Sequence, residues 1–591
     1  MVIFTVYSLT YWFDLAYIKI KEQQMDNARR KGAEILIDIL YQEGVEYMFG
    51  YPGGKAIPIF DALIESPIKF ILSRHEQGAT HMADGYARAT GKPGVVLVTS
   101  GPGATNTITG IMTAQMDSVP IVILAGQQNT NCLGLDTFQE ADMSGITYPL
   151  VKHSYLIKNP NEIPRVIKEA LHIATTGRPG PVLVDLPGDV TTALVDGPLI
   201  EEFDLPGYNL DYKQEAGEIK KAAEMIQAAK RPVIMVGHGA IISGAGKAIS
   251  YLANKMQIPV VNTLLGKGCF PETHPLNLGM PGMHGTAYAN MALIDCDLVI
   301  SIGARWDDRI ASHPATFCKH ARKIHIDIDP SEINKVIQVD VGLVGDAKDI
   351  LEQLTALLSK GDTSDWVKLC EKNRKRFPLT YKKEGKLKPQ HVVDEINKIS
   401  NGEAIVVTDV GQNQMWAAQF IKIDQPRHWI SSGGAGTMGF GFPASIGAQL
   451  GNPGKKVFTI VGDGGFQMTL CELATACINK LPIKIVVLNN NYLGMVRQWQ
   501  NLFWSNRLSG VDLEGNPNFV KLAEAYGAKA FRVRRSSDLK RVLNQAMAYN
   551  DGPCLIDCEV AKIENVFPMV PAGCPLEEMI LCEPKKKKEK E

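Results

Sequence analysis

The sequence predicts an α/β fold built from three doubly wound parallel-sheet domains. The chain has 591 residues, far more than the ~100–200 that one hydrophobic core usually holds. Runs such as 94–99 and 119–124 are apolar at consecutive positions, which is typical of strands buried on both faces. These strands alternate with helical patterns, and several end in glycine-rich turns, as in open parallel sheets that bind ligands at their carboxyl edge.

The first predicted domain spans residues 25–190. Its expected elements are a helix from Ala33, a helix at 79–90, and strands at 47–49, 70–72, 94–99, 119–124 and 181–187. Met25 opens a polar stretch that leads directly into the helical pattern. Residues 1–24 are therefore predicted to be a flexible or non-native extension.

The second predicted domain, 216–350, follows a linker at 191–215. A helix at 216–229 and a strand at 232–236 open it, and later strands end in glycines and acids at 237–239, 262–263, 303–305, 327–329 and 346. Such ends suit a nucleotide. No strict G-x-G-x-x-G is present, so the pattern alone leaves the ligand open.

The third predicted domain, 389–575, lies between a linker at 351–388, with a polar helical stretch at 364–386, and a tail at 576–591. Strands are expected at 404–409, 456–461 and 483–488, with a glycine-rich segment at 431–443. The first and third domains share the same alternation and a glycine-rich strand end, which predicts an old duplication.

Composition argues against several classes of protein. A formal net charge of -1 disfavours a protein held on nucleic acid by bulk charge. Eleven cysteines without a C-x-x-C pair indicate reduced thiols and a cytoplasmic location, and twelve histidines without H-E-x-x-H disfavour a zinc enzyme. The apolar start, 1–20, is interrupted by Asp14 and has no basic region or cleavage site, so neither a signal peptide nor a membrane span is expected. The charge run from Lys585 predicts a mobile tail.

The most informative stretch runs from Gly462 to Asn491. It reads as a strand end, the turn Gly462-Asp463-Gly464-Gly465, a helix through Cys477, a strand, and the cluster Asn489-Asn490-Asn491. In a βαβ unit the two strand ends meet at one edge, so the Asp463 carboxylate and the Asn490 amide should converge beside glycines that admit a phosphate. Two oxygen ligands beside a diphosphate predict a Mg²⁺ site. The spacing resembles the thiamine diphosphate (ThDP) signature, although an ordinary Asp-Gly turn is the alternative.

ThDP catalysis would place two further demands on the protein. Loss of the thiazolium C2 proton is assisted when a buried carboxylic acid protonates the aminopyrimidine ring. A bulky side chain must also hold the cofactor bent.

Three segments carry a resemblance that meets these demands. They are Ser73–Ala79 with Glu76, Met82–Arg88, and Ser100–Asn106, and they closely resemble the pyrimidine-binding domain of the acetohydroxyacid (acetolactate) synthase family, catalytic subunit. The resemblance extends from about Arg30 to Gly573. It names the three domains pyrimidine-binding, central FAD-type and diphosphate-binding.

The resemblance implies how ThDP and its metal are held. Glu76 matches the pyrimidine-activating glutamate and Met438 the wedge under the bent cofactor, while Gln412 and Met495 match further ThDP contacts. Asp463 and Asn490 match the side-chain ligands of Mg²⁺, and Tyr492 would add its backbone carbonyl. It also implies a homodimer or tetramer whose active site lies between subunits, and a small regulatory subunit.

For substrates, the resemblance implies pyruvate and 2-oxobutyrate. Trp499 matches the tryptophan that favours 2-oxobutyrate, a preference of about 1–3 kcal/mol for one methylene. Arg309 matches the arginine for the second ketoacid's carboxylate, and Met283 and Phe138 match apolar contacts. Gln139 and the backbone N–H of Gly54 would donate to developing negative oxygen.

The central domain is implied to bind FAD in a structural role. The matching positions are Arg178, Gly237, Gly239, Thr263, His284, Gly303, Arg305, Asp307, Asp327 and Asp346. Three positions depart from the family: Trp306 replaces Phe, Asn413 replaces a frequent His, and Gly188 replaces Lys. The last departure removes an expected cation.

The implied reaction is decarboxylation of pyruvate and carboligation to a second ketoacid, giving 2-acetolactate or 2-aceto-2-hydroxybutyrate for branched-chain amino acid synthesis. One alternative is a ThDP- and FAD-dependent pyruvate oxidase, in which the flavin takes electrons. Another is a regulatory scaffold that has lost catalysis. The joint presence of Glu76, Met438, Asp463 and Asn490 favours an enzyme.

Overall fold

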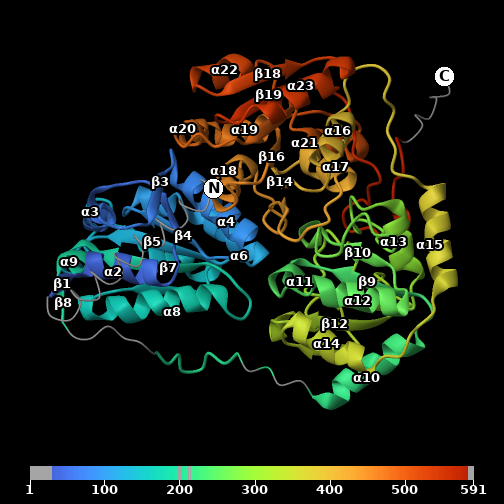
Figure 1. Ribbon diagram of the computed structural model, residues 1–591, viewed down its shortest axis with the longest axis horizontal. Helices are drawn as coiled ribbons and strands as arrows, with labels where there is room; N and C mark the ends of the chain where they lie inside the picture. The colour runs from blue at the N-terminus through green and yellow to red at the C-terminus, as the bar shows by residue number, and fades with distance from the viewer. Residues whose placement is uncertain (1–28, 197–202, 211, 213–214, 584–591) are drawn as a thin grey trace, which may run out of the picture.

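The computed structural model describes residues 29–196, 203–210, 212 and 215–583, and contains three α/β domains with parallel sheets (Figure 1). The predicted fold class is confirmed. The extension at 1–24 and the charge run from Lys585 lie outside the described residues.

The first sheet has the strand order β3-β2-β4-β5-β7-β6 and is parallel throughout. Its strands are β2 Tyr47–Gly50, β3 Lys69–Leu72, β4 Gly94–Val98, β5 Ile121–Gln127, β6 His153–Leu156 and β7 Val182–Pro187. Its helices are α2 Gly32–Gln42, α3 Ile57–Leu63, α4 Glu76–Thr90, α5 Pro102–Thr105, α6 Ile108–Asp117, α7 Met143–Thr147, α8 Ile163–Thr175 and α9 Gly188–Thr192.

The sequence pattern missed β6 because this edge strand is half exposed and not uniformly apolar. A short antiparallel pair, β1 Arg30–Lys31 with β8 Leu194–Val195, extends the contacts of this domain past residue 190.

The central sheet has the order β10-β9-β11-β12-β13. Its strands are β9 Pro232–Val236, β10 Val260–Asn262, β11 Leu298–Ile302, β12 Arg322–Asp327 and β13 Val341–Val344. Its helices are α10 Ala216–Ala228, α11 His238–Ile242, α12 Gly246–Met256, α13 Ala287–Asp295, α14 Ala347–Leu357 and α15 Ser364–Arg376.

The expected linker at 351–388 contains α15, which ends ten residues before the end of the helical stretch predicted at 364–386. The buried indole of Trp366 in α15 donates to the Pro232 carbonyl (3.0 Å), which fixes α15 against the central domain.

The third sheet has the order β15-β14-β16-β17-β19-β18. Its strands are β14 Ile405–Thr408, β15 Trp429–Ile430, β16 Val457–Gly462, β17 Lys484–Asn489, β18 Lys529–Val533 and β19 Cys554–Glu559. Its helices are α16 Pro389–Ser400, α17 Gln412–Phe420, α18 Gly441–Gly451, α19 Asp463–Met468, α20 Leu473–Ile478, α21 Gly494–Phe503, α22 Phe519–Ala525 and α23 Ser536–Ala548. Cys554 and Cys558 in β19 are buried in the core.

The helix predicted to follow Gly465 is broken. A short 3-10 turn, Leu470–Glu472, separates α19 from α20. The break puts the buried Glu472 carboxylate where it accepts the backbone N–H groups of Arg74 (3.0 Å) and His75 (3.1 Å) in the first domain. The 3-10 turn between α19 and α20 is thus hydrogen-bonded to the two residues that precede Glu76.

Helices α4 and α18 hold the first and third domains together (Figure 1). A Cβ on Gly85 would lie 2.0 Å from the Ala444 carbonyl oxygen, and one on Gly447 would lie 1.8 Å from the Met82 carbonyl oxygen. Glycine at both positions therefore lets the two backbones touch. The apolar residues around this contact form one core that includes both domains.

Candidate active site

Asp463 and Asn490 stand at the ends of neighbouring strands. β16 and β17 are parallel with Gly462 opposite Leu488, so both side chains lie at the carboxyl edge of the third sheet. The Asp463 Oδ2 accepts the N–H of Asn491 (2.8 Å), and the Asn490 Oδ1 accepts the N–H of Tyr492 (3.0 Å). Both residues are buried, and burial raises the pKa of the Asp463 carboxyl to about 6.

Asn516 belongs to this edge but did not stand out in the sequence. Its Nδ2 donates to the Asp463 Oδ2 (2.7 Å) and to the Asn491 Oδ1 (3.1 Å), and its Oδ1 accepts from the Gln467 Nε2 (2.8 Å). The only sequence signal is the turn Gly515-Asn516-Pro517, which has the composition of an ordinary loop. Its amide fixes one oxygen of the Asp463 carboxylate.

This edge suits a hard cation. Asp463 and Asn490, with the Tyr492 carbonyl expected from the sequence, would offer oxygen ligands only and leave positions for water and phosphate, which is the preference of Mg²⁺. Within the described residues, no group of three or more His, Cys, Asp and Glu side chains could hold a metal ion. A cation here would therefore depend on neutral oxygens as well as on the one carboxylate.

The adjoining turn has unused acceptors. Gln412 and Asn413 are buried, and their side-chain oxygens have no hydrogen-bond partner, although the Gln412 Nε2 donates to the Gln498 Oε1 (2.8 Å). Gly411, with φ of 131°, supplies a backbone conformation that L side chains rarely adopt. Buried acceptors without partners are costly, so these two fit a site completed by a ligand that donates hydrogen bonds.

A cavity of about 880 Å³ lies where the three domains meet, lined mostly by the central and third domains and on one side by first-domain residues such as Asp117 and Arg178. All ten positions matched to FAD line it, as do Met283, Arg309, Met438, Met495 and Trp499. Residues far apart in the sequence therefore line one cavity. The side chains predicted to contact substrate and ThDP line the same space as the glycines and acids at the strand ends of the central domain.

The central-domain part of the cavity has the features of a nucleotide cradle. A Cβ on Gly237 would lie 2.1 Å from the Gly303 carbonyl oxygen, and Gly303 itself has φ of 59°, so both positions require glycine. At the end of β12, burial raises the pKa of Asp327 to about 6. Burial also lowers the pKa of His284 to about 4, so this imidazole is neutral, and its Nε2 has no hydrogen-bond partner.

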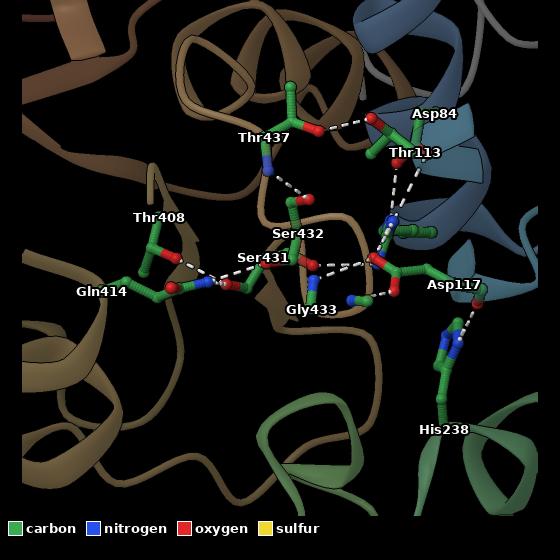
Figure 2. Close-up of polar contacts among 12 residues, drawn as sticks. Asp84, Thr113, Asp117, His238, Thr408, Gln414, Ser431, Ser432, Gly433 and Thr437 are labelled. Atoms are coloured by element: carbon green, nitrogen blue, oxygen red, sulfur yellow. Dashed lines mark hydrogen bonds and ion pairs between the residues drawn. The ribbon is translucent and has the colours of Figure 1, made fainter. Parts of the chain in front are cut away.

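The loop that carries Met438 is held by the first domain (Figure 2). The Asp117 carboxylate accepts the N–H groups of Gly433 (3.0 Å) and Gly434 (2.7 Å) and pairs with the Arg88 Nη2 (2.8 Å). All the side-chain partners are buried. The Arg88 Nε also pairs with the buried Asp84 Oδ1 (2.6 Å), which makes a buried charge triad. Such a triad adds little net stability, so its contribution here is to the position of the loop.

Two threonines add a second attachment to the same loop (Figure 2). The hydroxyls of Thr113 in α6 and Thr437 lie 2.7 Å apart, and the Thr437 N–H donates to the Ser432 Oγ (3.0 Å). Figure 2 also shows the His238 ring, which approaches the Asp117 carbonyl oxygen (2.8 Å) from the central domain. Residues from all three domains therefore meet at this loop.

The remaining predicted residues do not line the cavity. Glu76 begins α4, and its Oε2 accepts from the Asn106 Nδ2 (2.9 Å). A Cβ on Gly103 would lie 3.3 Å from the Glu76 Oε1 and 2.8 Å from the Thr99 Cγ2, and one on Gly101 would lie 2.8 Å from the Gln139 carbonyl oxygen. Glu76, Gln139 and Gly54 thus gather at the carboxyl edge of the first sheet, which we call the first-domain half-site.

Phe138, beside Gln139, is 84% exposed. In a single chain this side chain makes no pocket wall. Tyr148 and Leu135, which like Phe138 lie in the stretch of chain between β5 and β6, are also exposed, at 83% and 67%. Where large apolar side chains gather on a surface, another chain typically covers them.

Comparison with known proteins agrees with the three-domain architecture. Models of the thiamine pyrophosphate enzyme N-terminal TPP binding domain, central domain and C-terminal TPP binding domain match residues 30–146, 219–354 and 409–558.

Full-length relatives give a narrower assignment. The chain is 46% identical to "Acetolactate synthase" of Mycobacterium bovis, with 92% of this chain and 90% of that protein covered. It is 47% identical to "Probable acetolactate synthase large subunit" of Methanocaldococcus jannaschii (94% and 97% covered) and 45% identical to "Acetolactate synthase isozyme 3 large subunit" of Escherichia coli (93% and 98%). The chain therefore belongs to the acetolactate synthase large-subunit family of thiamine pyrophosphate enzymes.

Proposed function

We propose that this protein is an acetolactate synthase that decarboxylates pyruvate and joins the two-carbon unit to a second pyruvate or to 2-oxobutyrate. Its products would be 2-acetolactate and 2-aceto-2-hydroxybutyrate, which enter branched-chain amino acid synthesis. The observation that carries the proposal is the pair of sites described above. One is the first-domain half-site, which holds an acid, and the other is the carboxyl edge of the third sheet with Asp463 and Asn490, together with the large cavity where the three domains meet.

Bound ThDP would supply an activated thiazolium carbon and a sink for the electrons released on decarboxylation. Asp463, Asn490 and the Tyr492 carbonyl would hold Mg²⁺, and Gln412, Met438 and Met495 would contact the cofactor. The Glu76 carboxyl would keep a proton at the pyrimidine ring. Gln139 and the Gly54 N–H would donate hydrogen bonds to negative oxygen on the substrate.

Arg309 would bind the carboxylate of the second ketoacid, and Trp499, Met283 and Phe138 would shape the apolar part of its site. FAD would occupy the central-domain cradle. Because carboligation involves no net redox change, FAD would have a structural role.

We propose a homodimer or tetramer in which each active site combines the first-domain half-site of one chain with the cavity of another. The exposed Phe138 and the absence of Glu76 from its own chain's cavity support this. Mixing Glu76→Gln with Asp463→Ala subunits tests it, because a hybrid dimer would regain one intact site. Activity no higher than that of either variant alone would refute shared sites.

The relatives named large subunits suggest that this chain, too, takes a small regulatory subunit. We also propose a cytoplasmic location. All eleven cysteines are free thiols, as expected in a reducing compartment. None of the helices in the described part of the chain combines the length and the apolarity needed to span a bilayer.

Product analysis tests the reaction. Purified protein with ThDP, Mg²⁺ and FAD should convert pyruvate plus 2-oxobutyrate mainly to 2-aceto-2-hydroxybutyrate, identified by mass spectrometry. The oxidase alternative predicts stoichiometric bleaching of the flavin on anaerobic mixing with pyruvate, and the scaffold alternative predicts no product with or without a small subunit.

A further inference from the structure

Lys55 lies across the carboxyl edge of the first sheet. It directly follows Gly54 in the turn after β2, and its N–H donates to the Thr99 Oγ1 (3.3 Å) at the end of β4. A Cβ on Gly126 in β5 would lie 3.1 Å from the Lys55 Cβ, and one on Gly188 after β7 would lie 3.5 Å from its Cδ. The side chain therefore runs from β2 over the ends of β5 and β7, along the edge where open α/β sheets bind ligands.

Gly188 provides the room for this side chain. Its backbone is not left-handed, so the conformation does not require glycine. A side chain at 188 would start 3.5 Å from the Lys55 Cδ and 3.0 Å from the Asn129 Oδ1, and it would compete with Lys55 for the same space. Glycine at 188 and lysine at 55 are thus complementary choices.

The ammonium group of Lys55 has a neutral partner. Its Nζ donates to the Asn129 Oδ1 (3.3 Å), and among the described side chains no carboxylate lies within 4.0 Å of it. The nearby Asp189 carboxylate is occupied by the N–H of Thr130 (3.0 Å). An ammonium has three donors, so two N–H groups of this half-buried cation are available to an anionic ligand.

Lys55 is joined to the first-domain half-site through its backbone. Thr99, which accepts the Lys55 N–H, also lies beside Gly103 and Gly53, and Gly103 in turn lies beside the Glu76 carboxyl. The Lys55 ammonium, at Asn129, lies farther along the same sheet edge. A cation there without an ion-pair partner would attract the anionic part of a substrate.

We propose that Lys55 binds the carboxylate of the first ketoacid, pyruvate, at the first-domain half-site, with Gly188 leaving the space for its side chain. This proposal rests on the ketoacid carboligase function proposed above. It also accounts for the departure at 188, because the cation expected from that position reaches the same place from position 55.

The first test is Lys55→Gln, with Lys55→Arg as the conservative variant and Lys168→Gln on α8 as the matched loss of a half-buried lysine. Loss of one charged hydrogen bond predicts a KM for pyruvate about 10–100-fold higher in Lys55→Gln. Inhibition by methyl pyruvate, which has no carboxylate, should change less than about threefold, because the variant loses only an interaction with charge. The KM of Lys55→Arg for pyruvate should lie closer to that of the wild type, and the KM of Lys168→Gln should equal that of the wild type.

The second test moves the cation. Gly188→Lys alone should raise KM because two ammonium stems compete for one space, and Lys55→Ala alone should raise it because the cation is lost. The double variant Lys55→Ala/Gly188→Lys should bind pyruvate better than either single variant, a coupling that a double-mutant cycle measures.

Two results would overturn the proposal: a Lys55→Gln KM for pyruvate within twofold of the wild type, or equal losses for pyruvate and methyl pyruvate. A double variant no better than its parents would also count against it. These outcomes are separate from failure of the proposed function, which would appear as absence of acetolactate from the wild-type protein.

Discussion

Replacing Asn516 by alanine should weaken Mg²⁺ binding without unfolding the site. The change removes the Asn516 hydrogen bonds to the Asp463 Oδ2 (2.7 Å) and the Asn491 Oδ1 (3.1 Å) and the bond from Gln467 (2.8 Å). It leaves the Asn491 N–H on the same carboxylate oxygen. Asp463 therefore keeps one of its two fixed donors and gains rotational freedom. Loss of such a partner to a metal ligand typically weakens metal affinity by about 10–100-fold, or ~1.4–2.8 kcal/mol.

The assay is a Mg²⁺ titration of metal-free protein at saturating ThDP, followed by tryptophan fluorescence and, separately, by acetolactate formation. Asn518→Ala, two residues from Asn516, is the matched control. The Asn518 Oδ1 caps α22 by accepting the Lys521 N–H (3.2 Å) and also accepts from the Arg532 Nη2 (2.6 Å). Both variants should lose stability, but only Asn516→Ala should need more Mg²⁺. Half-saturation within twofold of the wild type in Asn516→Ala would refute the reasoning.

Four further outcomes are expected. Glu76→Gln should lower kcat by about 10² or more, measured as acetolactate formed at saturating ThDP, because the amide cannot transfer the proton; near-normal turnover would remove the glutamate from the mechanism. Trp499→Leu should abolish the preference for 2-oxobutyrate in a competition assay, and unchanged product ratios would contradict its role. Thr113→Val should weaken ThDP binding about fivefold, the value of one neutral hydrogen bond to the loop, whereas Thr147→Val, which loses only a bond to its own helix, should leave ThDP affinity unchanged in a calorimetric titration. Burial raises the pKa of Asp185 to about 7, well above its unfolded value near 4, so folding favours the protonated carboxyl and the stability of the protein falls as the pH rises from 4 to 7. Asp185→Asn should therefore melt at a higher temperature than the wild type at pH 8, with little difference at pH 4. Equal melting temperatures at pH 8 would contradict this.

Local patterns were sufficient to predict much of the fold. Strands such as β4 and β17 are apolar at every position because both faces are covered, and this makes them visible without a partner strand. The edge strand β6 is half exposed and has no such pattern. The break between α19 and α20 was likewise hidden, because the partner of Glu472 lies 397 residues earlier, at His75.

The candidate site divides in the same way. Asp463 and Asn490 could be placed together from the sequence, since parallel strand ends share an edge and the two strands are consecutive. Asn516 could not, because a loop amide has no periodicity and its role depends on where the loop returns. The space shared by Lys55 and Gly188 was equally invisible, as it depends on β2 and β7 lying in one sheet.

By itself, then, the sequence determined the parallel α/β architecture, the chemical types of the strand-end residues and the family they resemble, because these depend on local burial and on short motifs. Only the tertiary structure decided which of those residues share a space. It placed the ten FAD-type positions with Trp499 and Arg309 around one cavity, and it kept Glu76 in a separate half-site. The physical reason is that contacts such as Asp117 with Gly433, across 316 residues, are set by the packing of whole domains, which no local pattern encodes.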